Sequence, residues 1–135
     1  MHTKFTIITA VYNNVENIQH CIDSLNSQTY KNFEHIVIDG NSNDGTLEIL
    51  HHNKKKITKL ISEADKGICD AWNKGLKLAN GDVVGFLHSD DFFASDRSLE
   101  KIANAFNRNP HLDAVYMDLE YVSKNNIFYT KRKWK

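Results

Sequence analysis

Two adjacent carboxylates follow an apolar run in the middle of the chain. The stretch GDVVGFLHSDDFF (81–93) places the apolar residues 83–87 shortly before Asp90 and Asp91. The apolar side chains favour burial, whereas two neighbouring negative charges require water or a cation. Mg²⁺ or Mn²⁺ binds hard carboxylate oxygens, and needs only one or two of them when phosphate supplies further ligands. The pair therefore indicates a divalent metal between the protein and a phosphate-bearing ligand.

A simpler interpretation of the acidic pair is a turn that caps the next helix, since Asp is common in both places. The position of the pair at the end of a strongly apolar strand favours the metal site. A cation held there would stabilise negative charge that develops on a leaving diphosphate. Without it, the carboxylates would repel the same diphosphate.

The composition describes an ordinary globular chain. Its 135 residues suffice for one domain with a hydrophobic core. Seventeen basic and seventeen acidic side chains balance, so no global charge points to nucleic acid. The apolar runs fall far short of the roughly 18 residues that span a bilayer, and the N-terminus lacks the pattern of a signal peptide. Cys21 and Cys69 are far apart and are expected to be reduced, structural cysteines of the cytoplasm.

Strand-like and helix-like patterns alternate along the chain. This alternation predicts an α/β fold with a largely parallel sheet, covered by helices on both faces. The predicted strands are 5–11, 33–39, 57–62, 83–87, 114–122 and 127–130. Apolar residues at helical spacing predict helices around 15–25, 47–50, 68–79 and 99–106. The sequence therefore predicts a single α/β domain over residues 1–135.

Ligands of an open parallel sheet bind beyond the carboxyl ends of its strands. This rule selects four polar stretches, which follow the first four predicted strands: 10–14, 39–46, 63–67 and 88–91. None of them contains the glycine pattern of a dinucleotide-binding loop or of a P-loop. If phosphate binds here, the metal at Asp90 and Asp91 is the group that meets its charge.

Several motifs together resemble one enzyme family. They are TIITAVYNN, HIVIDGNSNDGT, SEADKGICDAWNKGLKLANGDVVGFLHSDD and VYMDLEYV, in this order along the chain. The chain resembles the donor-binding half of the family-two inverting glycosyltransferases with the GT-A fold, a Rossmann-like nucleotide-diphospho-sugar transferase fold. Among these it is most similar to the enzymes of bacterial surface-polysaccharide biosynthesis. The resemblance implies transfer of a sugar from a nucleotide-diphosphate donor, a UDP-sugar in the usual case.

The resemblance assigns nucleotide contacts to five matched positions. Thr9 and Tyr12 would line the pocket for the base, and Tyr12 would offer its ring for packing. Asp39 would accept a hydrogen bond from the base; the alternative is a turn-forming Asp before glycine. Asp65 and Lys66 would reach the base or ribose, and an exposed charged loop is an equally good interpretation of that pair.

The acidic stretch corresponds to the DXD motif of the family. His88, Ser89 and Asp90 occupy its three positions, with His88 and Ser89 on the nucleotide side and Asp90 as the direct ligand of Mn²⁺ or Mg²⁺. Asp91 would be a neighbouring or outer metal partner. The family usually has Asp or Asn at the position of His88, which leaves the choice of metal open.

Other matched positions are read as structural. Gly75 costs helix stability, so its presence predicts close packing of its helix on the sheet. Cys69 and Trp72 are read as packing residues.

The general base of the family has no match in this chain. It lies well beyond the DXD loop, and the family's full catalytic domain is longer, so we expect a domain truncated on its C-terminal side. Asp118 and Glu120 match a structural strand of the family instead. A non-catalytic nucleotide-sugar-binding module therefore remains an alternative to an enzyme. A sugar nucleotidyltransferase is disfavoured, because residues 10–14 lack that enzyme type's Gly-rich basic loop.

The resemblance also implies partners and location. The acceptor would be a glycan or a lipid-linked sugar, met in the cytoplasm or at the inner face of the membrane. The basic tail 131–135 could contact an anionic membrane, although a solvated terminus is the commoner case. A domain cut through its fold would expose apolar surface and favour self-association.

Overall fold

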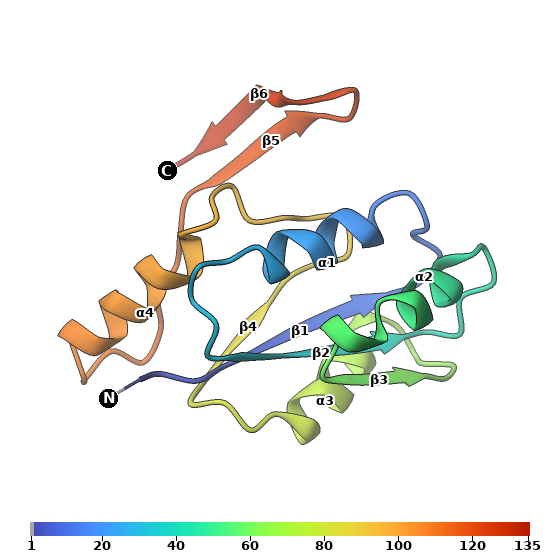
Figure 1. The fold of residues 1–135 in the computed structure, drawn as a ribbon, viewed down its shortest axis with the longest axis horizontal. Helices are drawn as coiled ribbons and strands as arrows, with labels where there is room; N and C mark the ends of the chain where they lie inside the picture. The colour runs from blue at the N-terminus through green and yellow to red at the C-terminus, as the bar shows by residue number, and fades with distance from the viewer. Residues whose placement is uncertain (1) are drawn as a thin grey trace.

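The computed structural model describes residues 2–135 and shows a parallel sheet between two layers of helices (Figure 1). Its strands are β1 (Phe5–Val11), β2 (Phe33–Asp39), β3 (Lys59–Ser62) and β4 (Val83–Phe86), in the order β3-β2-β1-β4 and all parallel. The helices are α1 (Ile18–Asn26), α2 (Thr46–His52), α3 (Ile68–Leu78) and α4 (Ser98–Arg108), with a short 3₁₀ turn η1 (Lys54–Lys56). The predicted α/β architecture is confirmed.

Strand β1 is the centre of the fold. All seven of its residues are buried, because the strand has a neighbour on each side and helices over each face. Its alternate side chains enter different core clusters: Ile7 packs in the cluster of α1 and α4, and Ile8 packs in that of α3. Helices therefore cover both faces of the sheet, as the alternation of patterns predicts.

The register of the sheet brings the segments after all four strands to one edge. Val11, the last residue of β1, pairs with Asp39, the last of β2, which in turn pairs with Ser62 of β3. On the other side of β1, the backbone N–H of Leu87 donates to the carbonyl of Ile8. The segments that follow these strands thus leave the sheet at the same end.

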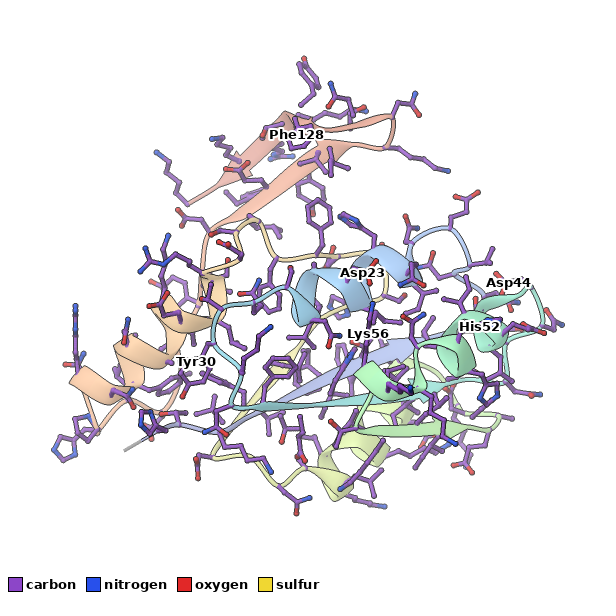
Figure 2. All side chains as sticks on the ribbon, in the orientation of Figure 1. Asp23, Tyr30, Asp44, His52, Lys56 and Phe128 are labelled. Carbon is purple, nitrogen blue, oxygen red and sulfur yellow. The ribbon has the colours of Figure 1, made fainter. Side chains whose placement is uncertain are left out.

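The C-terminal segment forms a separate two-stranded antiparallel sheet of β5 (Leu119–Ser123) and β6 (Asn126–Trp134). Figure 2 shows Phe128 on this hairpin, away from the four-stranded sheet. The predicted strand 114–122 begins too early, because residues 114–118 make no ladder. The basic tail is part of β6: Lys133 pairs with Glu120 at 3.1 Å, and the Arg132 guanidinium lies 4.0 Å from the Trp134 ring centre. These contacts extend the strand beyond its predicted end.

Two further details differ from the sequence predictions. Strand β3 begins at Lys59, because Ile57 follows the 3₁₀ turn and packs with the cluster of α1 and α2. Cys69 is exposed and is no packing residue, whereas Cys21 is buried. Within residues 2–135, no helix has both the length and the apolar content that a bilayer crossing needs.

Gly75 confirms the predicted close packing of its helix. The residue is buried in α3, and a Cβ placed on it would lie 2.6 Å from Cγ2 of Ile8. A contact this short is repulsive, so only glycine allows α3 to approach β1 so closely.

We expect Gly75→Ala to lower the free energy of unfolding by about 1 kcal/mol. The overpacking penalty of about 1–3 kcal/mol exceeds the gain of about 1 kcal/mol in helix propensity. Urea denaturation of the Gly75 and Gly75→Ala proteins, each in the wild-type and in the Ile8→Ala background, measures the effect. In the Ile8→Ala background the clash is absent, so the added methyl should be neutral or stabilising. Equal destabilisation in the two backgrounds would contradict this packing argument.

Candidate functional site

The loops after β1 and β2 are joined by side-chain hydrogen bonds. The backbone N–H of Asn13 donates to Ser42 Oγ, and that of Asn43 donates to Asn13 Oδ1, each at 2.9 Å. The backbone N–H of Asn14 donates to Thr46 Oγ1, also at 2.9 Å. Asn13 has a φ of 46°, a left-handed conformation that Asn tolerates better than most residues. The two loops therefore form one hydrogen-bonded unit beyond the sheet.

Asp39 lies beneath this unit and is fully buried. Its carboxylate accepts hydrogen bonds from Ser42 Oγ at 2.5 Å and from the Ser42 N–H at 3.1 Å. A third bond comes from Ser62 Oγ at 2.6 Å, in the strand on its other side. These donors compensate the cost of burying the charge. The contact of Asp39 with a base stays a prediction.

Tyr12 and Asp65 converge on the backbone of Gly40. A Cβ at Gly40 would lie 2.9 Å from Asp65 Oδ2 and 3.4 Å from Tyr12 Cδ2. The Tyr12 ring is exposed, and Asp65 is oriented by a 2.9 Å bond from the Gly67 N–H. Two residues that the sequence assigns to the nucleotide thus flank one glycine. Lys66 follows in the same exposed loop.

The acidic stretch forms a tight turn. The N–H of Asp91 donates to the carbonyl of His88 at 3.0 Å, so residues 88–91 close on themselves. The carbonyl of His88 also accepts from the buried thiol of Cys21 at 3.4 Å, and Ser89 Oγ accepts from Asn14 Nδ2 at 2.8 Å. The turn is thereby attached both to the loop after β1 and to α1.

Charge accumulates at the exposed end of this turn. Asp90 and Asp91 are both exposed. Desolvation raises the pKa of Asp91, the Asp90 carboxylate raises it further, and His88 opposes the shift. The ring of His88 lies 5.6 Å from that of Trp72, which also packs on Phe86. The turn therefore presents two neighbouring carboxylates beside an aromatic cluster.

These carboxylates fit a metal that takes few protein ligands. In the part of the chain that the structure describes, no group of three or more His, Cys, Asp or Glu side chains forms a complete ligand set. A structural zinc site needs such a set, whereas Mg²⁺ or Mn²⁺ bound to a diphosphate does not. Asp90 and Asp91 would hold such a cation with the phosphate oxygens of a ligand.

Thr9 lies below the loops and is fully buried. Its hydroxyl is hydrogen-bonded to His35 Nε2 at 2.9 Å, and Nδ1 of the same ring is buried without a partner among residues 2–135. The assigned base contact of Thr9 stays a prediction, and its burial favours a supporting position under the site.

Four residues of this site were not singled out from the sequence: Asn14, Gly40, Ser42 and Ser62. Each lies in or beside one of the four stretches predicted to face the ligand. Their hydrogen-bond partners are 20 to 75 residues away in several cases, so spacing along the chain carries no signal of them.

A separate cavity of about 510 Å³ lies between β4, α4 and residues 112–117. It is lined largely by apolar side chains, and none of the residues assigned to the nucleotide or the metal contributes to it. The candidate site is therefore defined by converging polar groups at the sheet edge and not by this cavity.

The chain matches the family described as Glycosyl transferase family 2 over residues 6–135. It belongs to glycosyl transferase family 2. The family resemblance inferred from the sequence motifs is thus confirmed, and residues 88–91 are the acidic turn of a family 2 protein.

Two family 2 relatives indicate how much of such a protein the chain covers. The UDP-Glc:alpha-D-GlcNAc-diphosphoundecaprenol beta-1,3-glucosyltransferase WfgD of Escherichia coli is 32% identical over 123 residues, which are 90% of this chain and 48% of WfgD. A PGL/p-HBAD biosynthesis glycosyltransferase of Mycobacterium bovis is 32% identical over 124 residues, with the same two coverages. The chain spans about half the length of these relatives.

Solved structures confirm the GT-A fold. Staphylococcus aureus TarS 1–349 in complex with UDP-GlcNAc aligns with a TM-score of 0.73 and 28% identity, over 79% of this chain and 32% of the TarS 1–349 chain. The mannosyltransferase PcManGT from Pyrobaculum calidifontis, in complex with GDP-Man and Mn²⁺, aligns with a TM-score of 0.71 over 95% of this chain and 38% of its own. Its identity of 21% supports the fold alone.

The buried His35 predicts a loss of stability in acid. Burial lowers the pKa of His35 from 6.5 to about 4. Between these values the unfolded chain binds more protons than the folded one, so the free energy of unfolding falls as the pH drops from about 6.5 to about 4. We expect a contribution of roughly 2 kcal/mol between pH 7 and pH 5.

Urea denaturation of wild type and His35→Gln at these two pH values isolates this contribution, because all other groups titrate alike in both proteins. The wild type should lose more stability in acid than the variant. Equal losses would show that His35 is protonated as readily in the folded chain as in the unfolded one.

Proposed function

We propose that this chain is the donor-binding part of a glycosyltransferase that uses a nucleotide-diphosphate sugar, with UDP as the nucleotide, together with Mn²⁺ or Mg²⁺. The supporting observation is the convergence of Tyr12, Gly40 and Asp65 at the edge of the sheet where the acidic turn also lies. Family membership makes sugar transfer the reaction that such an edge would serve.

The nucleotide would bind over the loops after β1, β2 and β3. The exposed ring of Tyr12 offers a face on which a base can stack. Gly40 has no side chain, so Asp65 can lie against its backbone beside that ring. The Asp65 carboxylate would then serve the base or ribose. Asp39 would accept a hydrogen bond from the base, from below the loops. Thr9 would lie in a supporting position under the site, and the exposed Lys66 would lie at the edge of the nucleotide pocket.

The diphosphate would lie toward the acidic turn. When bound there, a divalent cation would neutralise charge that develops on the leaving nucleotide. Asp90 is assigned as its direct ligand and Asp91 as the neighbouring carboxylate, while His88 and Ser89 would face the ribose side. The raised pKa of Asp91 fits a carboxyl group that gains from a nearby cation.

The acceptor of the sugar and the stereochemistry of its transfer are proposed for the whole protein. WfgD acts on GlcNAc-diphosphoundecaprenol, as its name states, which supports a glycan or lipid-linked acceptor. The cytoplasmic face of the membrane as the place of transfer is part of the proposal and follows from the sequence resemblance alone. Transfer with inversion would need a general base. Glu120 is engaged with Lys133 and Thr130, so we give it no such role. We assign the base to the part of the family 2 relatives that this chain does not match.

A non-catalytic nucleotide-sugar-binding module is the second candidate. The observation that favours it is the engagement of Glu120 in the hairpin, which leaves no assigned base on this chain. In either case residues 1–135 form the nucleotide-binding domain. Donor-hydrolysis measurements on the chain test turnover, and measurable hydrolysis would favour the enzyme. Because the base is assigned outside this chain, we expect UDP binding with little or no transfer, an outcome that both candidates allow.

Titration calorimetry of UDP with and without Mn²⁺ tests the metal assignment. We expect UDP to bind more tightly with Mn²⁺, and Asp90→Ala to weaken that binding roughly 10-fold or more, because a charged ligand of the cation is lost. Asp96→Ala, which removes an exposed carboxylate from a loop outside the acidic turn, should bind like the wild type. Unchanged affinity of Asp90→Ala in the presence of Mn²⁺ would refute the metal assignment.

Gly40→Ala tests the nucleotide assignment independently of the metal. The added methyl would collide with Asp65 and approach the Tyr12 ring. A steric penalty of about 1 kcal/mol or more would lower the affinity for UDP roughly 5-fold or more. The loss should be equal with and without Mn²⁺. As a control, Gly85→Ala places its methyl only near Cδ1 of Ile7 and should leave UDP affinity unchanged. A Gly40→Ala variant with wild-type affinity would place the nucleotide elsewhere.

A further inference from the structure

The acidic turn is attached to the rest of the molecule by the side chains of Asn14, which follows β1, and of Cys21 in α1. Asn14 Nδ2 donates to Ser89 Oγ at 2.8 Å, and the Cys21 thiol donates to the carbonyl of His88 at 3.4 Å. Ser89 and His88 both precede Asp90 in the turn. Two of the residues that lead into the carboxylates are therefore held from outside the turn.

Asn14 is held on several sides at once. Its backbone N–H donates to Thr46 Oγ1 at 2.9 Å, and its Oδ1 accepts from Asn17 Nδ2 at 2.8 Å. Its carbonyl accepts from the N–H of Ile18, the first residue of α1, at 3.1 Å. Thr46 is in turn fixed by a 2.6 Å bond to Asp44. Because its backbone and its Oδ1 are both engaged, the amide group that faces Ser89 has little freedom.

These bonds make Asn14 a bridge between two parts of the site. One end binds the loop after β2, which carries Ser42 and supports Asp39. The other end binds Ser89 in the acidic turn, 75 residues further along the chain. Asn14 itself need not touch a ligand, since both of its partners lie beside the groups that would.

We propose that Asn14 is a positioning residue that couples the nucleotide-binding loops to the acidic turn by fixing the orientation of Ser89. This inference rests on the proposed function. A cation shared by the turn and a diphosphate needs its carboxylates at a set distance from the nucleotide. Without the Asn14 bond the turn would be held from outside only by the Cys21 thiol at His88. Ser89 would then have more orientations open to it, and metal-dependent binding would carry the cost of ordering it.

A double-mutant cycle on Mn²⁺-dependent UDP binding tests the coupling. The variants are Asn14→Ala, Ser89→Ala and the double mutant, each compared with wild type by calorimetry at saturating Mn²⁺. Loss of one hydrogen bond predicts about fivefold weaker binding for Asn14→Ala. Because both substitutions remove the same bond, the double mutant should bind about as weakly as the weaker single mutant. Losses that multiply in the double mutant would overturn the proposal.

A second readout separates positioning from a general loss of structure. The Mn²⁺ concentration that half-saturates UDP binding should rise about fivefold in Asn14→Ala, while UDP binding without metal stays at the wild-type level. Asn26→Ala is the matched control, because its Nδ2 also makes one bond, to the carbonyl of Ile22 within α1, and lies outside the turn. It should show wild-type Mn²⁺ dependence. An equal shift in Asn14→Ala and Asn26→Ala would mean a merely structural role.

The outcomes for the two proposals are distinguishable. If the wild type binds no UDP in the presence of Mn²⁺, the proposed function fails, and the positioning role fails with it. If the wild type binds UDP with Mn²⁺ and Asn14→Ala binds equally well, only the positioning role is refuted. Should Asn14→Ala fold poorly, Ser89→Ala removes the same bond and leaves the other contacts of Asn14 in place.

Discussion

The pairing of β1 on both sides is the constraint on which the rest of the molecule depends. Its seven residues are buried, and it is bonded to β2 on one side and to β4 on the other. Because all these strands are parallel, the loops after β2 and β4 leave the sheet at the same end, about 10 Å apart at two strand spacings. A ligand at this edge therefore meets residues that lie far apart in the sequence. The close contact of Gly75 with Ile8 holds α3 against the same strand.

Side-chain hydrogen bonds take over where the strands end. Asn13 and Asn41 have positive φ values of 46° and 66°, a backbone arrangement that carries some strain for residues other than glycine. The Asn13 N–H donates to Ser42 Oγ, and Asn13 Oδ1 accepts from the Asn43 N–H; these bonds offset that strain and connect the two loops. Because the loops are already ordered in the free protein, they lose less conformational entropy when a ligand binds. Asp44, labelled in Figure 2 at the end of the molecule toward which β1 and β2 point, ties the same loops through Val15 and Thr46.

Buried and exposed charges have different tasks at this edge. Asp39 is enclosed and accepts three hydrogen bonds, from the Ser42 N–H, Ser42 Oγ and Ser62 Oγ, so it stabilises the loops. Asp90 and Asp91 are exposed and adjacent, and the pKa of Asp91 is raised. An acidic turn of this kind is unfavourable without a counter-charge. The proposed cation meets that need, and the attachment of the turn to α1 decides where the cation would lie.

The sequence by itself determined the family, the α/β architecture and the polar stretches that lie together at one edge of the sheet, because periodicity, strand order and local motifs are all present in the linear sequence. It also identified Tyr12, Asp39, Asp65 and the acidic pair as candidates. The tertiary structure decided the rest. Strand β6 continues through the basic tail, where Lys133 contacts Glu120 on the neighbouring strand, and Cys69 is exposed. Folding also places Gly40 beside Asp65 and Asn14 beside Ser89. Such pairs could not be predicted from one sequence, because a hydrogen bond or a close contact between distant residues depends on register and helix position, and these are fixed only when the whole sheet is packed.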